Sequence, residues 1–348
     1  MDLHTLQITW FGLIAVLWTG YLVLEGFDFG VGMLLPVLGR DDAERRVLVN
    51  TIGPVWDGNE VWLITAGGAM FAAFPQWYAT LFSALYLPLL LVLVALILRG
   101  VAFEYRGKID DDRWRSRWDA AIVFGSAVPA LLWGLAFGTI LQGIDADALA
   151  DSPWKVLLGV LHPYVLLTGA TTVLLFCLHG ALFLSLRTTE GLRERCRATA
   201  RRLAPAVLVV AGAWALWTQL AHGTGWTWVP VALAIAALLA TLWLSRGTRD
   251  GRAFALTCLA ITAAVVTIFG SLYPAVLPIN GGGTDLTVEN ASSTELTLQI
   301  MTGVAVLFTP VVVAYQAWTY WVFRYRIGVT DIPPSTGLTP FGRSTTTA

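Results

Sequence analysis

The chain has 348 residues, of which 56% are hydrophobic and 13% carry a charge. A soluble domain of ordinary composition has about a quarter of its residues charged, so this composition excludes one and indicates a polytopic membrane protein. The net charge of -1 hides a concentration of basic residues in a few loops. None of the three cysteines stands in a CxxC pair, so neither a disulfide framework nor a zinc site is predicted.

Apolar segments of the length that a bilayer requires, roughly 20 residues, recur along the chain. The first follows Met1-Asp-Leu-His-Thr5, which lacks the positive charge of a signal peptide, so we expect a membrane span there. We predict an all-α polytopic membrane protein with nine transmembrane helices. Their ranges are 6–36, 52–73, 77–99, 118–143, 156–186, 203–221, 226–245, 253–274 and 296–323.

Basic residues predict the orientation of these spans, because cytoplasmic loops are enriched in Lys and Arg. Of the 22 Lys and Arg residues, all but Lys155 lie where spans one, three, five and seven end or in the C-terminal tail. The N-terminus is therefore predicted outside and the C-terminus in the cytoplasm. The predicted outer loops are short and acidic, with Asp145, Asp147 and Asp151, or glycine-rich, as in 280–285.

The spans predict a single transmembrane domain over residues 1–330 and a disordered cytoplasmic tail over 331–348. Spans one to four and five to eight both start outside. Two four-helix bundles, with halves 1–145 and 150–275, and a peripheral ninth helix at 296–323 are therefore expected. No sequence repeat supports this duplication.

Acidic residues interrupt the first apolar segment. Glu25, Asp28 and Gly32 fall at i, i+3 and i+7, which places them on one face of a helix. Gly26 and Gly30 form a GxxxG pair on a neighbouring face, which allows another helix to approach closely. One face of this helix is thus predicted to carry charge, and the next to pack tightly.

The second apolar segment carries Gly53, Asp57 and Glu60 at i, i+4 and i+7, and a short basic hairpin over residues 39–46 joins it to the first. Counted from the hairpin, Asp28 lies roughly 10 residues and Asp57 about 7 residues into the membrane, or about 10 to 15 Å. The two acidic faces are therefore predicted to lie at similar depth.

Carboxylates below the membrane surface require a partner or water, because an ionised one in hydrocarbon costs several kcal/mol. One interpretation is a proton-uptake path that opens to the cytoplasm. Its members would be Glu25, Asp28, Asp57 and Glu60. The alternative is a set of helix-pairing carboxylates matched by Arg45, Arg46 or Arg99.

Two of the four histidines, His162 and His179, fall in the fifth predicted span, 17 residues apart and on different faces. A buried histidine could ligate haem together with Met33 or Met70. A histidine that is hydrogen-bonded between packed helices is the favoured interpretation.

Four strings in the first half of the chain, in this order, resemble subunit II of the cytochrome bd-type quinol oxidases. They are Gly26-Phe-Asp-Phe-Gly-Val-Gly32, Gly39-Arg-Asp-Asp-Ala-Glu-Arg-Arg46, Trp56-Asp-Gly-Asn-Glu-Val-Trp-Leu-Ile-Thr-Ala-Gly-Gly68 and Phe103-Glu-Tyr-Arg-Gly-Lys108. The resemblance is dense over residues 1–145 and extends to the whole chain in span count and topology.

The resemblance implies a partner, subunit I, that carries haem b and haem d and oxidises quinol, while subunit II ligates no haem. The complex reduces oxygen to water with protons from the cytoplasm and so builds a proton-motive force without pumping. A quinone held structurally, small single-helix subunits and a location in the bacterial inner membrane are further expectations. No catalytic residue, metal site or nucleic-acid partner is expected for this chain.

Carried over by motif, Asp28 and Asp57 would belong to a proton-supply path or to the contact with subunit I. Trp56, Asn59 and Trp62 would lie near that contact. Glu25 stands where relatives can have Asp, and the two histidines of the fifth span receive no role from the resemblance.

Two functions of other classes use the same residues. A proton-coupled secondary transporter would need membrane carboxylates, but such transporters commonly have broken helices in both halves, and here the polar residues concentrate in one half. A structural assembly subunit would use the carboxylates only to hold its partner.

Overall fold

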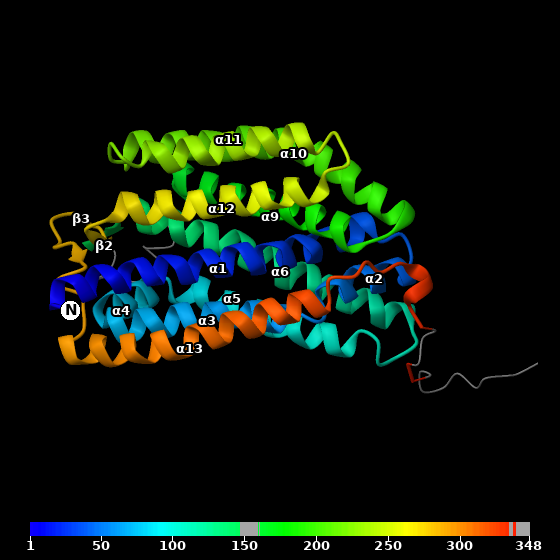
Figure 1. The fold of residues 1–348 in the computed structure, drawn as a ribbon, viewed down its shortest axis with the longest axis horizontal. Coiled ribbons are helices and arrows are strands. Elements are labelled where there is room, and N and C mark those ends of the chain that lie inside the picture. The colour runs from blue at the N-terminus through cyan, green and yellow to red at the C-terminus, as the bar shows by residue number, and fades with distance from the viewer. Residues whose placement is uncertain (147–158, 160, 334–336, 339–348) are drawn as a thin grey trace, which may run out of the picture.

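The fold is a bundle of long helices laid side by side between two ends of the molecule (Figure 1). A computed structural model describes residues 1–146, 159, 161–333, 337 and 338. Its α-helices are α1 (Leu3–Leu38), α2 (Asp42–Ile52), α3 (Trp56–Ala73), α4 (Pro75–Ala84), α5 (Tyr86–Tyr105), α6 (Asp112–Gln142), α9 (Pro163–Arg187), α10 (Glu190–Ala221), α11 (Trp228–Leu244), α12 (Asp250–Leu272) and α13 (Glu295–Val322).

The two ends of the bundle differ in structure and charge (Figure 1). At one end, β1 (Ile144–Asp145) pairs in parallel with β3 (Ile279–Asn280), and β2 (Ala275–Leu277) pairs antiparallel with β4 (Leu286–Thr287). At the other end lie α2, the turns between α5 and α6 and between α9 and α10, and the 3₁₀ helix η1 (Val329–Asp331). We call this second end the basic end, because the arginines of these turns gather there.

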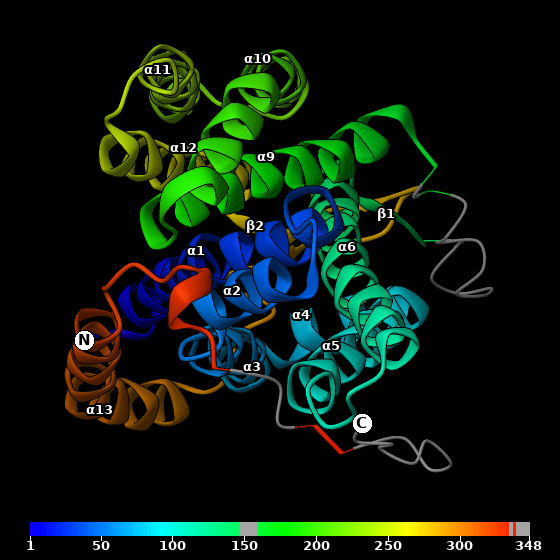
Figure 2. The ribbon, with the colours of Figure 1, turned by 90° about the vertical axis from the view of Figure 1, so that its right-hand side faces the viewer.

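The helices pack in two neighbouring groups with α13 at the periphery (Figure 2). In the first group α1 packs against α3 and α6, and α5 packs against α6. In the second, α9 packs against α10 and α12, and α11 packs against α10 and α12. Contacts of α9 with α1 and α6 join the groups, while α13 lies against α1 and α3. The division into halves 1–145 and 150–275 stays a prediction, although these groups follow it.

Seven helices in the described part of the chain are long and apolar enough to cross a membrane, which makes it a multi-pass membrane protein. They are α1, α5, α6, α9, α10, α12 and α13. The shorter helix α11 is apolar but has 17 residues. Helix α3 starts with Asp57, Asn59 and Glu60, which lower its hydropathy. The predicted count of nine spans and the orientation of the termini therefore stay predictions.

The segment between α1 and α3 differs from the predicted hairpin, because residues 42–52 form the separate helix α2. The Asp41 side chain accepts a hydrogen bond from the Glu44 backbone N–H, 2.9 Å away, and so caps this helix. Residues 53–55 then separate α2 from α3, and Pro54 has no backbone N–H with which to continue the hydrogen bonds of α2. The helix of the second predicted span, 52–73, therefore begins at Trp56 as α3.

The third predicted span is also two helices, α4 and α5, which meet at Leu85. Pro88 lies in the first turn of α5. Within a continuous helix its ring would clash with the carbonyl of Ala84, so the chain breaks there. The predicted span at 77–99 is therefore broken.

Parts of two predictions fall outside the described residues. The fifth span was predicted from residue 156, and α9 is described from Pro163. Of the predicted disordered tail, residues 334–336 and 339–348 are not described. Asp147, Asp151 and Lys155 of the predicted outer loop are not described either. The described part of the tail contacts the basic end, where the Leu338 N–H donates to the Lys108 carbonyl at 2.8 Å.

Ion pairs fasten the helices together at the basic end. Asp119 of α6 accepts hydrogen bonds from Arg106 Nε at 2.5 Å and from Arg45 Nη1 at 3.0 Å. Arg106 Nη2 also donates to Asp42 of α2, at 2.9 Å. The buried carboxylate of Asp119 thus joins α2, the end of α5 and the start of α6.

Glycines let α1 and α9 approach each other closely. A Cβ atom at Gly30 would collide with the backbone of Phe176 and Gly180 on α9, and one at Gly26 would collide with the Phe176 ring. The prediction that Gly26 and Gly30 mark a close helix contact is confirmed. Because these glycines leave no room for a side chain, they fix the spacing of α1 and α9.

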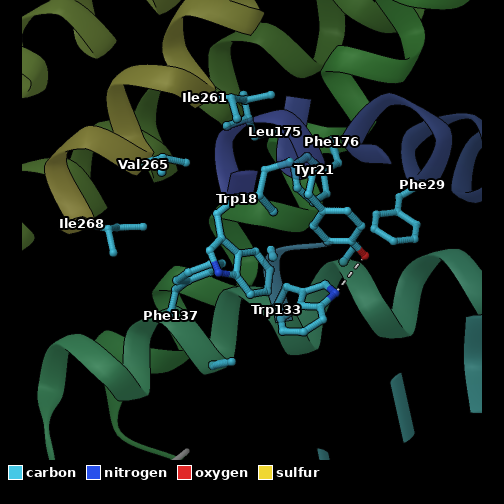
Figure 3. Packing of buried hydrophobic residues seen from close by; sticks show 14 of the residues in the cluster. Trp18, Tyr21, Phe29, Trp133, Phe137, Leu175, Phe176, Ile261, Val265 and Ile268 are labelled. Carbon is cyan, nitrogen blue, oxygen red and sulfur yellow. Dashed lines mark hydrogen bonds between the residues drawn. The ribbon is translucent and has the colours of Figure 1, made fainter. Parts of the chain in front are cut away.

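Next to this crossing, aromatic side chains from α1 and α6 fill the core (Figure 3). The rings of Trp18 and Trp133 lie 4.9 Å apart and those of Trp18 and Phe137 lie 5.1 Å apart, both edge to face. Trp133 Nε1 donates a hydrogen bond of 3.0 Å to the hydroxyl of the fully buried Tyr21, so the one polar group of that ring is satisfied.

Replacing Gly30 with Ala should lower the thermal stability of the purified protein, because the added methyl group meets backbone that cannot move aside. Gly12 of the same helix has no atom within 4 Å of a built Cβ, so Gly12→Ala is the matched control and should not lower it. Melting temperatures measured by size-exclusion chromatography of heated samples would decide. Equal melting temperatures for the two variants would contradict the close packing of α1 on α9.

Candidate functional site

The most deeply buried charges form a cluster around Arg99 of α5. The guanidinium Nη2 forms an ion pair with Glu25 Oε1 of α1, and neither side chain is exposed at all. Glu60 Oε2 of α3 lies 3.7 Å from the same nitrogen. Carboxylates from two other helices thus pair with Arg99, and this pairing offsets the free-energy cost of burying its charge.

Asp28 lies one turn beyond Glu25 on α1 and is likewise fully buried. Its Oδ2 accepts a hydrogen bond of 2.7 Å from Asn59 Nδ2 of α3. The same amide carries its oxygen toward α13, where it accepts from the Tyr320 hydroxyl at 2.6 Å and from Gln316 Nε2 at 3.3 Å. The site therefore draws on α1, α3, α5 and α13.

Aromatic rings enclose the cluster. The Arg99 guanidinium lies 4.7 Å from the ring centre of Phe29 and 5.8 Å from that of Phe103, within the range of cation–π attraction. Tyr21 lies one turn before Glu25 on α1 and Trp18 about two turns before it, toward the strand end of the bundle. Figure 3 shows the rings of Trp18, Tyr21 and Trp133 packed together.

Several polar atoms in the cluster have no hydrogen-bonding partner among the described residues. They are Glu25 Oε2, Asp28 Oδ1, and Nε and Nη1 of Arg99. Buried polar atoms in folded proteins are ordinarily paired with protein or ordered water. The cluster thus keeps acceptor and donor capacity that protein contacts do not use.

The cluster approaches the surface on the side of α3. The Glu60 side chain is 19% exposed, in contrast to Glu25 and Arg99. Asp57, one turn earlier, is exposed and makes no side-chain hydrogen bond or ion pair within the described residues. Asp57 lies in the first turn of α3, which begins at Trp56, and its depth of 10 to 15 Å stays a prediction.

The side chains predicted near a subunit contact lie differently from one another. Asn59 is fully buried within this chain and faces α13. Trp62 is half-buried, and its Nε1 donates to Gln316 Oε1 of α13 at 2.7 Å. Trp56 is half-buried with its ring 5.2 Å from that of Phe103. A partner could therefore touch Trp56 and Trp62 directly but not Asn59.

The sequence indicated Glu25, Asp28 and Glu60 as members of the cluster, and Arg99 as one of three candidate partners, but it did not indicate the link to α13. Gln316 and Tyr320 lie 257 and 261 residues from Asn59 in sequence, inside an apolar helix with no charged neighbour to draw attention. Their one signal is that Gln316 is the single amide residue in the second half of α13.

Chemically, the cluster can hold protons. One guanidinium can balance one carboxylate, and Glu25, Asp28 and Glu60 supply three. A buried carboxylate without a counter-charge is costly and takes up a proton instead. A buried set of carboxylates with one exposed edge and unused oxygen atoms is suited to receive, hold and pass on protons.

The described residues do not fit a haem held by this chain. His179 is fully buried, but its Nδ1 lies 2.7 Å from Thr257 Oγ1 and its Nε2 lies 3.0 Å from the Val23 carbonyl, so both nitrogens are engaged. Its ring also stacks on Phe254 at 4.5 Å. His162 caps α9 through its Nδ1. In the described part of the chain, no three His, Cys, Asp or Glu side chains group in a way that could hold a metal ion.

Residues 6–323 match the family described as cytochrome bd terminal oxidase subunit II. The chain belongs to this family. The resemblance inferred from its sequence strings is confirmed. Those strings include the end of α1, the start of α3 and the end of α5, so the residues that gave the likeness also surround the buried cluster.

Relatives and a solved structure agree with this assignment. The cytochrome bd ubiquinol oxidase subunit 2 of Bacillus subtilis (strain 168) is 43% identical over 333 residues, which cover 94% of this chain and 97% of the relative. The cytochrome bd-I ubiquinol oxidase subunit 2 of Escherichia coli (strain K12) is 37% identical over 376 residues, covering 97% and 99%. The structure of bd oxidase from Geobacillus thermodenitrificans shares the fold, with a TM-score of 0.76, 18% identity and coverage of 92% and 98%.

Replacing Arg99 with Met should strongly destabilise the protein, by about 3 to 5 kcal/mol, because Glu25 would remain buried without its cation. The double variant Glu25→Leu/Arg99→Met removes both charges and should recover part of that loss. Arg113→Met, at an exposed arginine of α6, is the control. Yield and melting temperature would be compared in mild detergent. A single Arg99→Met variant as stable as the control would contradict the ion pair.

Proposed function

We propose that this chain is the subunit II of a quinol-oxidising, oxygen-reducing complex in the bacterial inner membrane, and that it supplies protons to a haem-bearing subunit I. The observation that carries the proposal is the buried cluster of Glu25, Asp28 and Glu60 around Arg99, which approaches the surface at Glu60 of α3. Family membership and the names of the relatives, which are quinol oxidase subunits, support the same conclusion.

The proposed orientation places the basic end in the cytoplasm. Arg40, Arg45 and Arg46 lie there, as do the arginines that flank the turn between α9 and α10, and cytoplasmic loops are enriched in such residues. Protons would then be taken from the cytoplasm. Since quinol releases its protons at the opposite face, each oxygen reduced would add to the proton-motive force without pumping.

In this proposal Asp57 is the surface acceptor at the start of the path, Glu60 is the next carboxylate, and Glu25 and Asp28 hold protons in the interior. Asp57 and Glu60 are three residues apart on α3 and therefore on one face of that helix. Arg99 keeps the interior from accumulating uncompensated negative charge. The ring of Tyr21 and the rings beside it stop water and protons from continuing to the strand end.

The proposed contact surface for subunit I is formed by α3 and α13. Apolar side chains on both helices project from the chain, including Ile64 of α3 and Leu307 and Val311 of α13. Trp62 lies between the two helices, bonded to Gln316, and Trp56 borders them. The haems b and d belong to subunit I in this proposal, in keeping with the engaged histidines of this chain. Small single-helix subunits would attach to other lipid-facing helices.

We also propose that a quinone binds in a structural role in an apolar groove, which α3, α4, α5, α6 and α12 enclose. The groove has a volume of about 540 Å³. Its lining includes Met70, Phe71, Tyr78, Phe82, Leu89 and Phe137. That volume falls within the range of small-molecule pockets, and the lining suits a quinone with its isoprenoid tail.

Charge-neutral replacement of the carboxylates tests the proposed proton supply. Asp28→Asn and Glu60→Gln should each slow quinol-dependent oxygen uptake by the assembled oxidase by about tenfold or more, since positioned acid–base groups commonly contribute at least that much. Asp57→Asn should slow it less, because water can reach the next carboxylate directly. Haem absorbance should stay unchanged, because these residues ligate no haem.

The control for this series is Glu104→Gln, a carboxylate of α5 that is exposed near the basic end. It should respire at the wild-type rate. Loss of haem and of subunit I in the cluster variants would instead indicate a purely structural assembly role. Wild-type oxygen uptake in Asp28→Asn and Glu60→Gln would contradict the proposal.

A further inference from the structure

The Asn59 side chain is bonded at both of its ends, to α1 on one side and to α13 on the other. Its Nδ2 donates to Asp28 Oδ2 at 2.7 Å and, more weakly, to the Leu24 carbonyl at 3.4 Å. Its Oδ1 accepts from the Tyr320 hydroxyl at 2.6 Å and from Gln316 Nε2 at 3.3 Å. No exposed surface remains on this residue, so water cannot replace these partners.

The direction of this hydrogen-bond chain is determined by Trp62. Its indole N–H donates to Gln316 Oε1 at 2.7 Å, and an indole nitrogen can only donate. Gln316 must therefore present its oxygen to Trp62 and its NH₂ group to Asn59. Asn59 must in turn present its oxygen to α13 and its own NH₂ group to Asp28.

A reversed Asn59 amide would break this order at both ends. Its oxygen would face the Asp28 carboxylate, where two acceptors would meet without a hydrogen, and its NH₂ group would face the NH₂ group of Gln316. Buried polar groups left unpaired in this way are costly. The orientation of the amide thus depends on Gln316 and Tyr320, which bond to the Asn59 oxygen, at the opposite end of the amide from Asp28.

We infer that Gln316 and Tyr320 of α13 are positioning residues for the proton path: they hold the Asn59 N–H against Asp28 Oδ2, and leave Asp28 Oδ1 as the atom that takes and releases the proton. Asp28 Oδ1 is the oxygen of this carboxylate without a partner among the described residues. The inference rests on the proposed proton-supply function and goes further, because it assigns the proton to one atom and gives α13 a part in its transfer.

Helix α13 is suited to this role because it is otherwise attached by few side chains. Leu298 is its one buried residue. Near the strand end Trp10 Nε1 of α1 donates to Thr302 Oγ1 at 3.0 Å. Near the basic end Gln316 and Tyr320 make the contacts with α3 just described. A shift of α13 would therefore be felt at the Asn59 amide before it reached the core.

The test compares two double variants in the assembled oxidase. Gln316→Leu/Tyr320→Phe, on α13, removes both donors to the Asn59 oxygen. Gln76→Leu/Tyr105→Phe makes the same chemical changes at exposed positions of α4 and α5, away from the proposed contact surface, and is the matched control. Haem absorbance confirms assembly, and quinol-dependent oxygen uptake is recorded as a function of pH.

The inference predicts that Gln316→Leu/Tyr320→Phe keeps its haem, respires about tenfold more slowly, and has its pH profile displaced by about one unit, as expected when a carboxylate loses an oriented hydrogen bond. Each single variant should lose less than the double, because one donor still orients the amide. The control should match the wild type in rate and profile. A double variant whose rate and profile coincide with those of the control overturns the inference.

If Gln316→Leu/Tyr320→Phe does not assemble, Trp62→Phe provides the decisive variant. It removes the N–H that determines the direction of the chain and keeps an aromatic ring in place, with Trp243→Phe at an exposed tryptophan of α11 as its control. A displaced pH profile supports the inference and an unchanged one overturns it. Asp28→Asn distinguishes failure of the inference about α13 from failure of the proposed function. If that variant respires normally, the proton-supply function itself fails, whatever the α13 variants show.

Discussion

The buried ion pair between Arg99 and Glu25 is the constraint on which the rest of the cluster depends. A guanidinium with no exposure must have a carboxylate beside it, and here α1, α3 and α5 all bring acidic or basic groups to one point. The close crossing of α1 and α9 at Gly30 and Gly180, next to this point, keeps α1 where Glu25 can reach Arg99. Packing and charge therefore support each other.

Three carboxylates around one guanidinium give the site more acidic than basic groups, and the proposed function uses this excess. A fully compensated cluster would be inert, whereas this one has oxygen atoms that protein donors leave unused. Its surroundings are asymmetric as well. Toward the strand end Trp18, Tyr21 and Trp133 pack edge to face, and toward the basic end Glu60 and then Asp57 lead to the surface. In the proposed function, this asymmetry would give proton movement a direction.

The sequence predicted the individual helices and their faces better than the contacts between helices. Hydropathy located the long apolar helices, and helical spacing placed Glu25 and Asp28 on one face and Gly26 and Gly30 on a packed one, because local geometry decides such features. Arg99 could be named only as one of three candidate partners, since it lies 74 residues from Glu25. The breaks near Pro54 and Pro88 were missed because a hydropathy window averages over them.

The link to α13 could not have been predicted from single residues. Gln316 and Tyr320 gain their meaning from Asn59, more than 250 positions away, and from the fact that Trp62 can only donate. Such a chain exists only after the helices have packed. Under the inference drawn above, this chain of hydrogen bonds gives the peripheral helix a part in proton transfer, although nearly all of its surface faces away from the chain.

In the proposed function, this chain works only with a haem-bearing partner. The measurement that tests it most directly is a reduced-minus-oxidised absorbance spectrum of the material that co-purifies with the tagged chain in mild detergent, taken together with quinol-dependent oxygen uptake. We predict haem absorption bands, a second large subunit and oxygen uptake that requires quinol. A colourless, monodisperse protein without a partner would contradict it.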